Sequence, residues 1–501
     1  MTDRPDVLLL FTDMQRADTI HALGNDVIKT PHLDRLVREG TSFTNCHTPS
    51  PVCVPARCCM HYGLYAQRTG VFDNRPMMDD NGRSLPAVLG ANGYRTRAVG
   101  KCHFTPDKHA LRGFDSRRTQ EECTSDPEDD DYVAWLEANG YDYYEANGAR
   151  GEMYYIPQVS CLPAEAHPTQ WVGNESVRFI QERATVEEPW FLFSSYIHPH
   201  PPFAPPKPWH KLYRTNEGPL PFVPTESEGL LTWVNRAQNR YKWRDRGIDQ
   251  NLVRTIKAYC YATISFVDYQ VGRILAALEA TGRLDNTLIL FASDHGEYLG
   301  DYNCFGKRSM HDAASRVPMI VRMPARFEAG VECDAATSLV DVMPTILGAA
   351  GFGREGLDLD GLDLAAVSRG EHADRTVYSQ FGSHQQGIYM AVNRKWKYFY
   401  SAGDDREFLF DRVDDPQESV NLAGGETSRT SQAEMKQDLL EYLQSVNASE
   451  AFLESETGLE WKKYDHIDQT YLRDPDAGFL FQDYPSYELD APEYLGRGDS
   501  E

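Results

Sequence analysis

The stretch VLLLFTD, residues 7–13, is an unbroken apolar run that ends in a carboxylate. Short apolar runs without alternation are typical of strands buried on both faces of a parallel sheet. Helical patterns, the clearest at 254–281, separate this run from similar ones, which are YRTRAVG (94–100), WFLFSSYI (190–197), NTLILFAS (286–293) and VPMIVRMP (317–324). This alternation predicts an α/β fold with a large, mainly parallel mixed sheet flanked by helices.

The pattern changes near residue 375. The stretches GIYMAVNRKWKYFY (387–400) and REFLFDRV (406–413) alternate in the way of antiparallel strands, and 431–447 has helical spacing. We therefore expect a large α/β domain at 1–375 and a smaller α+β domain, with an antiparallel sheet, at 376–501. Its aromatic and acidic tail lacks periodicity and is expected to pack against a neighbour, which suggests a homo-oligomer.

Composition excludes several classes of protein. The 501 residues carry a net charge of -25, which argues against nucleic acid or an anionic membrane as a partner. No run approaches the roughly 20 apolar residues of a membrane-spanning helix. The start lacks an export signal, so we expect a cytoplasmic protein with reduced thiols. An acidic protein that binds an anionic substrate also needs a local positive site.

The segment PVCVPAR, residues 51–57, places a cysteine two residues before a proline and four before an arginine. Pro55 suits the first turn of a helix, where a missing N–H costs nothing. Cys53 would then lie at a helix N-terminus, which favours anions, and Arg57 would return to the same side one turn later. For an isolated cysteine, the simpler interpretation is a buried thiol at a helix start.

The spacing Cys-x-Pro-x-Arg resembles the signature of the type I sulfatases, in the alkaline phosphatase superfamily. In that family the cysteine is oxidised after translation to formylglycine, an aldehyde that is hydrated to a geminal diol. The resemblance covers most of the chain and implies that Cys53 becomes this residue. It also implies a formylglycine-generating enzyme as a partner during maturation.

The resemblance also implies one divalent metal. Its ligands would be Asp13 at the end of the first strand, the modified Cys53, and the Asp294–His295 pair in ASDHGEYLGDY. The family usually implies Ca²⁺, and the histidine nitrogen leaves room for Mn²⁺ or Zn²⁺. Met14 departs from the family pattern, because a thioether is a poor ligand for a hard cation. Either Gln15 or water takes its place, or the site is weaker.

The positive site follows from the same resemblance. AVGKCHF supplies Lys101 and His103, and FGKRSM supplies Lys307. Together with Arg57, these lysines are expected to hold the sulfuryl oxygens, while His103 deprotonates the second hydroxyl of the diol. In SYIHPHPPF, His200 is the better match for the proton donor to the leaving alcohol and His198 the second choice. Asn74 matches a substrate-binding position.

We therefore expect a sulfatase that hydrolyses a sulfate monoester. Two alternatives remain: a phosphonate monoester or phosphodiester hydrolase of the same superfamily, and a non-catalytic binder of sulfated ligands. The Lys101/His103 pair favours sulfate, because phosphonate hydrolases tend to carry smaller neutral or aromatic groups there. A small-molecule and a saccharide ester both fit. The irregular insertion at 121–170 either packs against the core or forms a subsite; its candidate residues are Tyr143, Tyr144, Tyr154, Tyr155 and His167.

Overall fold

The structure, a computed structural model, describes residues 4–467 except Arg75, 123–125, Tyr144, 151–153, 240–248, Glu355 and Thr457. The tail that is predicted to make a homo-oligomer contact lies after residue 467, outside the described residues. None of the helices described is both long enough and apolar enough to cross a membrane.

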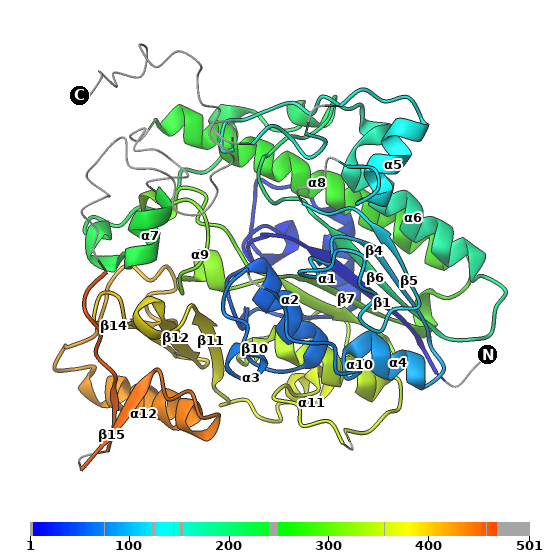
Figure 1. Cartoon of the computed structure of the whole chain (residues 1–501). Coiled ribbons are helices and arrows are strands. Elements are labelled where there is room, and N and C mark those ends of the chain that lie inside the picture. The colour runs from blue at the N-terminus through cyan, green and yellow to red at the C-terminus, as the bar shows by residue number, and fades with distance from the viewer. Residues whose placement is uncertain are drawn as a thin grey trace, which may run out of the picture.

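An eight-stranded mixed sheet forms the centre of the larger part, in the order β5-β4-β6-β1-β7-β8-β2-β9 (Figure 1). Five strands, β5, β4, β6, β1 and β7, are mutually parallel, and β8 runs antiparallel to β7. The strands are β1 (Asp6–Thr12), β2 (Thr41–Phe43), β4 (Arg95–Gly100), β5 (Ser116–Thr119), β6 (Trp190–Tyr196), β7 (Thr287–Ser293), β8 (Met319–Arg322) and β9 (Val331–Cys333). The predicted α/β fold is confirmed.

Strand β1 shows why the apolar run decides the fold. Val7, Leu9 and Phe11 point to one face of the sheet, and Leu8 and Leu10 point to the other. The first face is covered by α2 (Cys53–Tyr62), α4 (Leu85–Ala91), α10 (Val342–Ala349) and α11 (Leu364–Ser368). The second is covered by α1 (Pro31–Glu39), α5 (Asp131–Ala138), α6 (Pro168–Glu182) and α8 (Gln250–Ala280).

The C-terminal part contains a four-stranded antiparallel sheet, made of β11 (Val377–Phe381), β12 (Ile388–Val392), β13 (Trp396–Ser401) and β14 (Arg406–Asp411). Helix α12 (Arg429–Ser445) packs on one face of this sheet, and β15 (Phe452–Ser455) pairs with β16 (Gly458–Trp461) beside it. The other face shares an apolar cluster with Val52, the residue before α2. The small sheet therefore supports the start of that helix.

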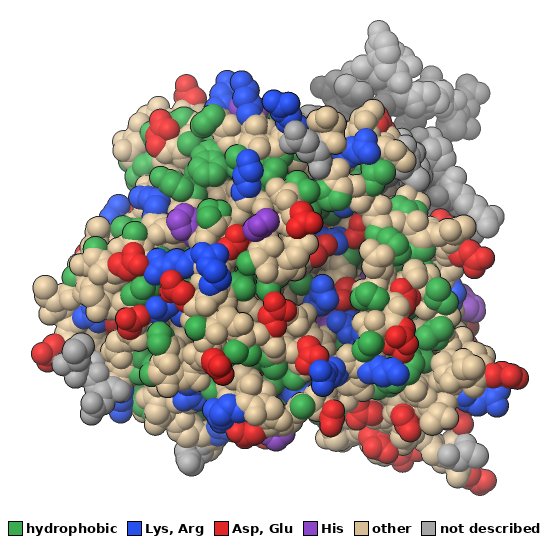
Figure 2. All heavy atoms as spheres, turned by 180° about the vertical axis from the view of Figure 1, so that it is seen from behind, with side chains coloured by type: hydrophobic (Ala, Val, Ile, Leu, Met, Phe, Trp, Pro, Cys, Tyr) green, Lys and Arg blue, Asp and Glu red, His purple; other side chains and the backbone are tan. Residues whose placement is uncertain are grey.

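Among the further short elements, β3 (Cys46–His47) pairs with β10 (Thr337–Ser338), and α3 (Ala66–Thr69), α7 (Trp233–Gln238) and α9 (Asp312–Ser315) are short α-helices. On the face seen in Figure 2, Lys and Arg side chains are scattered among Asp and Glu side chains. The basic residues that the sequence analysis singled out, Arg57, Lys101 and Lys307, are instead buried inside the molecule.

Asp268 of α8 ties that helix to α1 in the second helical layer. It is buried, and its Oδ1 accepts hydrogen bonds from the backbone N–H groups of Leu33 (2.7 Å) and His32 (3.1 Å) at the start of α1. The first N–H groups of a helix have no partner within it. We predict that Asp268→Ala lowers the free energy of unfolding by about 2 kcal/mol, and Asp268→Asn by less, because it keeps an acceptor. Urea unfolding checks this, and equal losses in the two variants would contradict it.

Candidate active site

The candidate site lies beyond the carboxyl ends of adjacent parallel strands, where open α/β sheets bind their ligands. Asp13 follows β1, Asp294 and His295 follow β7, and Lys101 follows β4. Strands β4 and β6 pair, β6 pairs with β1, and β1 pairs with β7. Residues that are far apart in the sequence therefore meet at one edge of the sheet.

Cys53 is the first residue of α2, and Pro55 lies in its first turn, as the sequence predicts. Val52 precedes the helix in an extended conformation. The side-chain oxygen of Asn74 accepts a hydrogen bond from Val54 N at 3.1 Å, so that it satisfies one N–H at the helix start. Asn74 thus lies beside Cys53, although its role towards a substrate stays a prediction.

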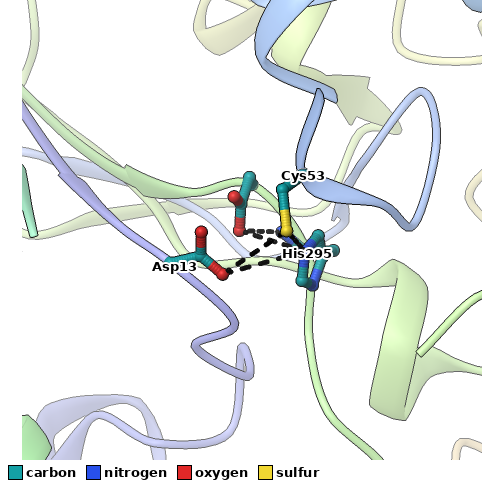
Figure 3. Close-up of side chains that lie close together, drawn as sticks. Asp13, Cys53 and His295 are labelled. Carbon is teal, nitrogen blue, oxygen red and sulfur yellow. Dashed lines mark hydrogen bonds and ion pairs between the residues drawn. The ribbon is translucent and has the colours of Figure 1, made fainter. Parts of the chain in front are cut away.

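Four side chains converge beneath this helix start. Ligand atoms of Asp13, Cys53, Asp294 and His295 all lie within 4.8 Å of one another, and all four residues are fully buried. The Cys53 Sγ lies 3.3 Å from His295 Nε2 and 3.8 Å from Asp13 Oδ1, and Figure 3 shows the three side chains pointing toward each other. Two carboxylates and an imidazole at such distances form a donor set that suits a divalent cation.

The pKa values of the two carboxyl groups differ. Burial acts against ionisation of Asp13, but Lys101, His200 and Arg57 outweigh it and hold its pKa well below the usual range. Burial, together with the charge of Asp13, raises the pKa of Asp294 to about 6. A bound cation would relieve this repulsion between like charges.

Of the two residues that follow Asp13, only Gln15 has a side chain that suits a metal ligand. Met14 is buried with a positive φ of 67°, and its sulfur lies 3.8 Å from Lys307 Nζ, so it offers no hard donor. The side chain of Gln15 is fully buried, and its amide atoms have no hydrogen-bond partner among the described residues. An orphaned buried amide costs free energy unless something binds it. Gln15 therefore fits the replacement ligand that the sequence left open.

Arg57 and Lys101 are completely buried against the same carboxylates. The Arg57 guanidinium contacts Asp294 Oδ2 at 3.0 Å and Asp13 Oδ2 at 3.1 Å, and also donates to the carbonyl of Lys101 and the hydroxyl of Ser195. Four of its five N–H groups are thus in use. These contacts use Arg57 to orient the two carboxylates, and its predicted role towards the sulfuryl oxygens stays a prediction.

Two ammonium groups flank the thiol. Lys307 Nζ lies 2.9 Å from Cys53 Sγ, and Lys101 Nζ lies 2.7 Å from Asp13 Oδ2. Burial and Asp13 oppose ionisation of Cys53, but Lys307, Lys101 and His295 outweigh them and hold its pKa well below the usual range. The atom at position 53 therefore lies in surroundings that stabilise negative charge, which is what a nucleophile needs.

His200 and His103 complete the set of predicted residues. His200 is buried with its Nε2 3.4 Å from Glu122 Oε1 and 3.5 Å from the Tyr154 hydroxyl, and burial lowers its pKa to about 3. A ring nitrogen of His103 lies within 4.8 Å of Cys53 Sγ. His198 Nδ1 bonds to the hydroxyl of Thr169 at 3.0 Å, and the choice of His200 over His198 as proton donor stays a prediction.

Sequence reasoning missed Glu122 and Arg150. Glu122 Oε2 lies 2.7 Å from Lys101 Nζ, and Arg150 contacts Glu122 Oε1 at 2.9 Å. Both belong to the insertion, which has no periodicity that would place its side chains. Of the aromatic candidates in it, Tyr154 and Tyr155 are buried, with Tyr154 beside His200. His167 packs against His198, Tyr143 bonds to Glu137, and Tyr144 lies outside the described residues.

Comparison with known proteins shows the fold and the family of the chain. The chain superposes with a TM-score of 0.75 on the phosphonate monoester hydrolase of Agrobacterium radiobacter, with 24% identity, over 92% of this chain and 100% of that one. The two proteins share a fold. The model of the sulfatase family matches residues 5–352, and the chain belongs to this family of hydrolases within the alkaline phosphatase superfamily. A second model, described as N-sulphoglucosamine sulphohydrolase, C-terminal, matches residues 300–445.

Two curated relatives are similar over most of their length. The chain is 29% identical over 451 residues to an arylsulfatase of Clostridium perfringens, covering 84% of this chain and 91% of that protein. It is 27% identical over 488 residues to a choline-sulfatase of Rhizobium meliloti, covering 93% of this chain and 92% of that protein.

The donor set predicts a loss of metal affinity when one carboxylate is removed. We expect Asp294→Asn to weaken Ca²⁺ binding at least roughly tenfold and Gln15→Ala to weaken it less, because a charged ligand contributes more than an amide. Isothermal titration with Ca²⁺, Mn²⁺ and Zn²⁺ in turn measures this and ranks the ions. The matched control is Asp414→Asn, an exposed aspartate outside the site. Unchanged affinity in Asp294→Asn would contradict the assignment.

Proposed function

We propose that the protein is a sulfatase that hydrolyses a sulfate monoester through a formylglycine made from Cys53. The observation that carries this proposal is the position of Cys53 Sγ, at a helix start, 2.9 Å from Lys307 Nζ and beside Asp13 and His295. In the proposed mature protein a hydroxyl oxygen of the hydrated aldehyde replaces that sulfur. The family membership supports the reaction class, and the site supports the choice of nucleophile.

Asp13, Asp294, His295 and Gln15 would hold the divalent cation, for which we propose Ca²⁺. When bound, the ion supplies positive charge that favours the ionised diol and polarises a sulfuryl oxygen. Arg57 keeps the two carboxylates in place. Lys101 and Lys307 carry the positive charge that faces the sulfuryl oxygens, and they stabilise the charge that develops there.

In the first step a hydroxyl oxygen at position 53 gives its proton to water and attacks the sulfur of the ester. A bond forms between this oxygen and sulfur, the bond from sulfur to the alcohol oxygen breaks, and the alcohol leaves with a proton from His200. Burial lowers the pKa of His200 to about 3. The negative charge of the bound ester favours its protonated form, with Lys307 as the neighbouring second donor.

In the second step His103 takes the proton of the remaining hydroxyl. The carbon–oxygen bond to the sulfated oxygen then breaks, inorganic sulfate leaves and the aldehyde returns, to be hydrated again by water. An ordinary serine or cysteine ester would need a fresh attack by water. The geminal diol avoids this because its second hydroxyl expels the sulfate from within.

The phosphonate monoester or phosphodiester hydrolase remains the second candidate, since the chain shares the fold of the Agrobacterium enzyme. The relatives named above make 4-nitrophenyl sulfate and choline sulfate suitable probes. Rates measured side by side on 4-nitrophenyl sulfate and on a phenyl phosphonate monoester distinguish the two. A higher kcat/KM for the phosphonate would replace our proposal.

Substitution of the nucleophile tests the proposed function directly. Cys53→Ala should lower kcat by roughly a thousandfold or more, because the residue forms the covalent bond. The unfolding midpoint should change little, since only one buried sulfur is removed. Cys58→Ala, one turn along the same helix and also buried, serves as the control and should retain activity. Turnover that survives in Cys53→Ala would rule out the mechanism.

The proposed role of His200 as proton donor can be tested with two leaving groups. General acid catalysis contributes about a hundredfold or more when the leaving group is a poor one. His200→Ala should therefore lower kcat for an alkyl sulfate at least about a hundredfold, and lower it much less for 4-nitrophenyl sulfate, whose phenolate leaves without a proton. Steady-state kinetics on both esters measure the difference. Equal losses on both would show that His200 is not the proton donor.

A further inference from the structure

Glu122 places a carboxylate inside the site that we propose binds an anionic substrate. Its Oε2 lies 2.7 Å from Lys101 Nζ, and its Oε1 lies 3.4 Å from His200 Nε2. A carboxylate oxygen of Glu122 also lies within 4.8 Å of Cys53 Sγ. The side chain is 12% exposed, so it lines the site rather than the outer surface. None of the catalytic steps above uses it.

The Glu122 carboxylate lies at a distance from position 53 that the oxygens of a bound sulfuryl group would also have. Reacting atoms approach to about 3 Å before attack. With the ester sulfur at that distance from the attacking atom, its oxygens fall in the same shell as the Glu122 oxygen. A carboxylate also resembles two oxygens of a sulfuryl group in charge and spacing. Lys101 and His200, which we assign to the sulfuryl group and the leaving oxygen, are the groups that Glu122 contacts.

Arg150 allows the side chain to leave without losing every partner. Arg150 Nη1 contacts Glu122 Oε1 at 2.9 Å, and its Nη2 donates to the Glu122 carbonyl at 3.2 Å. Asn147 Nδ2 donates to the same carbonyl at 3.2 Å. The backbone of Glu122 is therefore anchored, so that moving the carboxylate away from Lys101 requires only rotation about the side-chain bonds.

We propose that Glu122 is a resident anion that occupies the sulfuryl subsite of the empty enzyme and is displaced by the sulfuryl group of the substrate. The inference rests on the proposed function in taking the incoming anion to be a sulfuryl group. An internal competitor weakens the binding of every anion that needs this subsite. Inorganic sulfate has no alcohol part that could make further contacts with the protein, so competition with Glu122 weakens its binding in full. Glu122 therefore promotes release of this product.

Binding of inorganic sulfate tests this without turnover. Isothermal titration should give a Kd for Glu122→Gln that is roughly three- to tenfold lower than for the unsubstituted protein, since a competing charge is removed and the side-chain shape is kept. Glu122→Ala should shift in the same direction. Glu128→Gln, an exposed glutamate of the same segment, makes the same change in net charge and should leave the Kd unchanged.

Kinetics on 4-nitrophenyl sulfate supply the second readout. In Glu122→Gln the KM and the inhibition constant of inorganic sulfate should fall by similar factors. A Kd for sulfate that is unchanged or higher in both Glu122 variants would overturn the proposal, and so would a raised KM, which would place Glu122 against the alcohol instead. If no variant turned over the ester but the Kd for sulfate changed as predicted, the result would refute the sulfatase function and leave the role of Glu122 in anion binding intact.

Discussion

The contact on which the site depends is the one between the Arg57 guanidinium and the two carboxylates, Asp13 and Asp294. Two buried carboxylates at the ends of β1 and β7 repel each other, and burial makes that repulsion costly. A planar guanidinium that donates to both holds them together. Because Arg57 lies one turn after Cys53, the same contact fixes the start of α2, and with it the nucleophile, above the carboxylates.

The remaining charges follow from that arrangement. Lys101 neutralises Asp13 from the β4 side, and Lys307 lies against the sulfur of Cys53. Arg57, Lys101 and Lys307 lie among the carboxylates of Asp13, Asp294 and Glu122. The proposed divalent cation would make this region positive within a chain of net charge -25. Glu122 is part of the same arrangement, since its carboxylate contacts the buried ammonium group of Lys101.

The sequence predicts the strands that are buried on both faces, because they appear as unbroken apolar runs. The polar residues at the ends of these strands are predicted with them, because each one directly follows such a run. It does not predict β2, β5 and β9, which are short and at or near the edge of the sheet, so that no apolar run marks them. Motif spacing brings Cys53, Lys101 and His200 to one place, but it does not show that Arg57 faces the carboxylates. Glu122 and Arg150 lie in an irregular insertion, where position depends on contacts between distant residues and no periodicity reveals it.

The central claim is that the sulfur of Cys53 is the precursor of the nucleophile. The most direct test is mass spectrometry of the peptide that contains residue 53, from protein produced together with a formylglycine-generating enzyme and active on a sulfate ester. The account predicts an aldehyde or its hydrate at residue 53, in a fraction that rises in proportion to kcat across preparations. A fully retained thiol in a preparation that turns over the ester would contradict it.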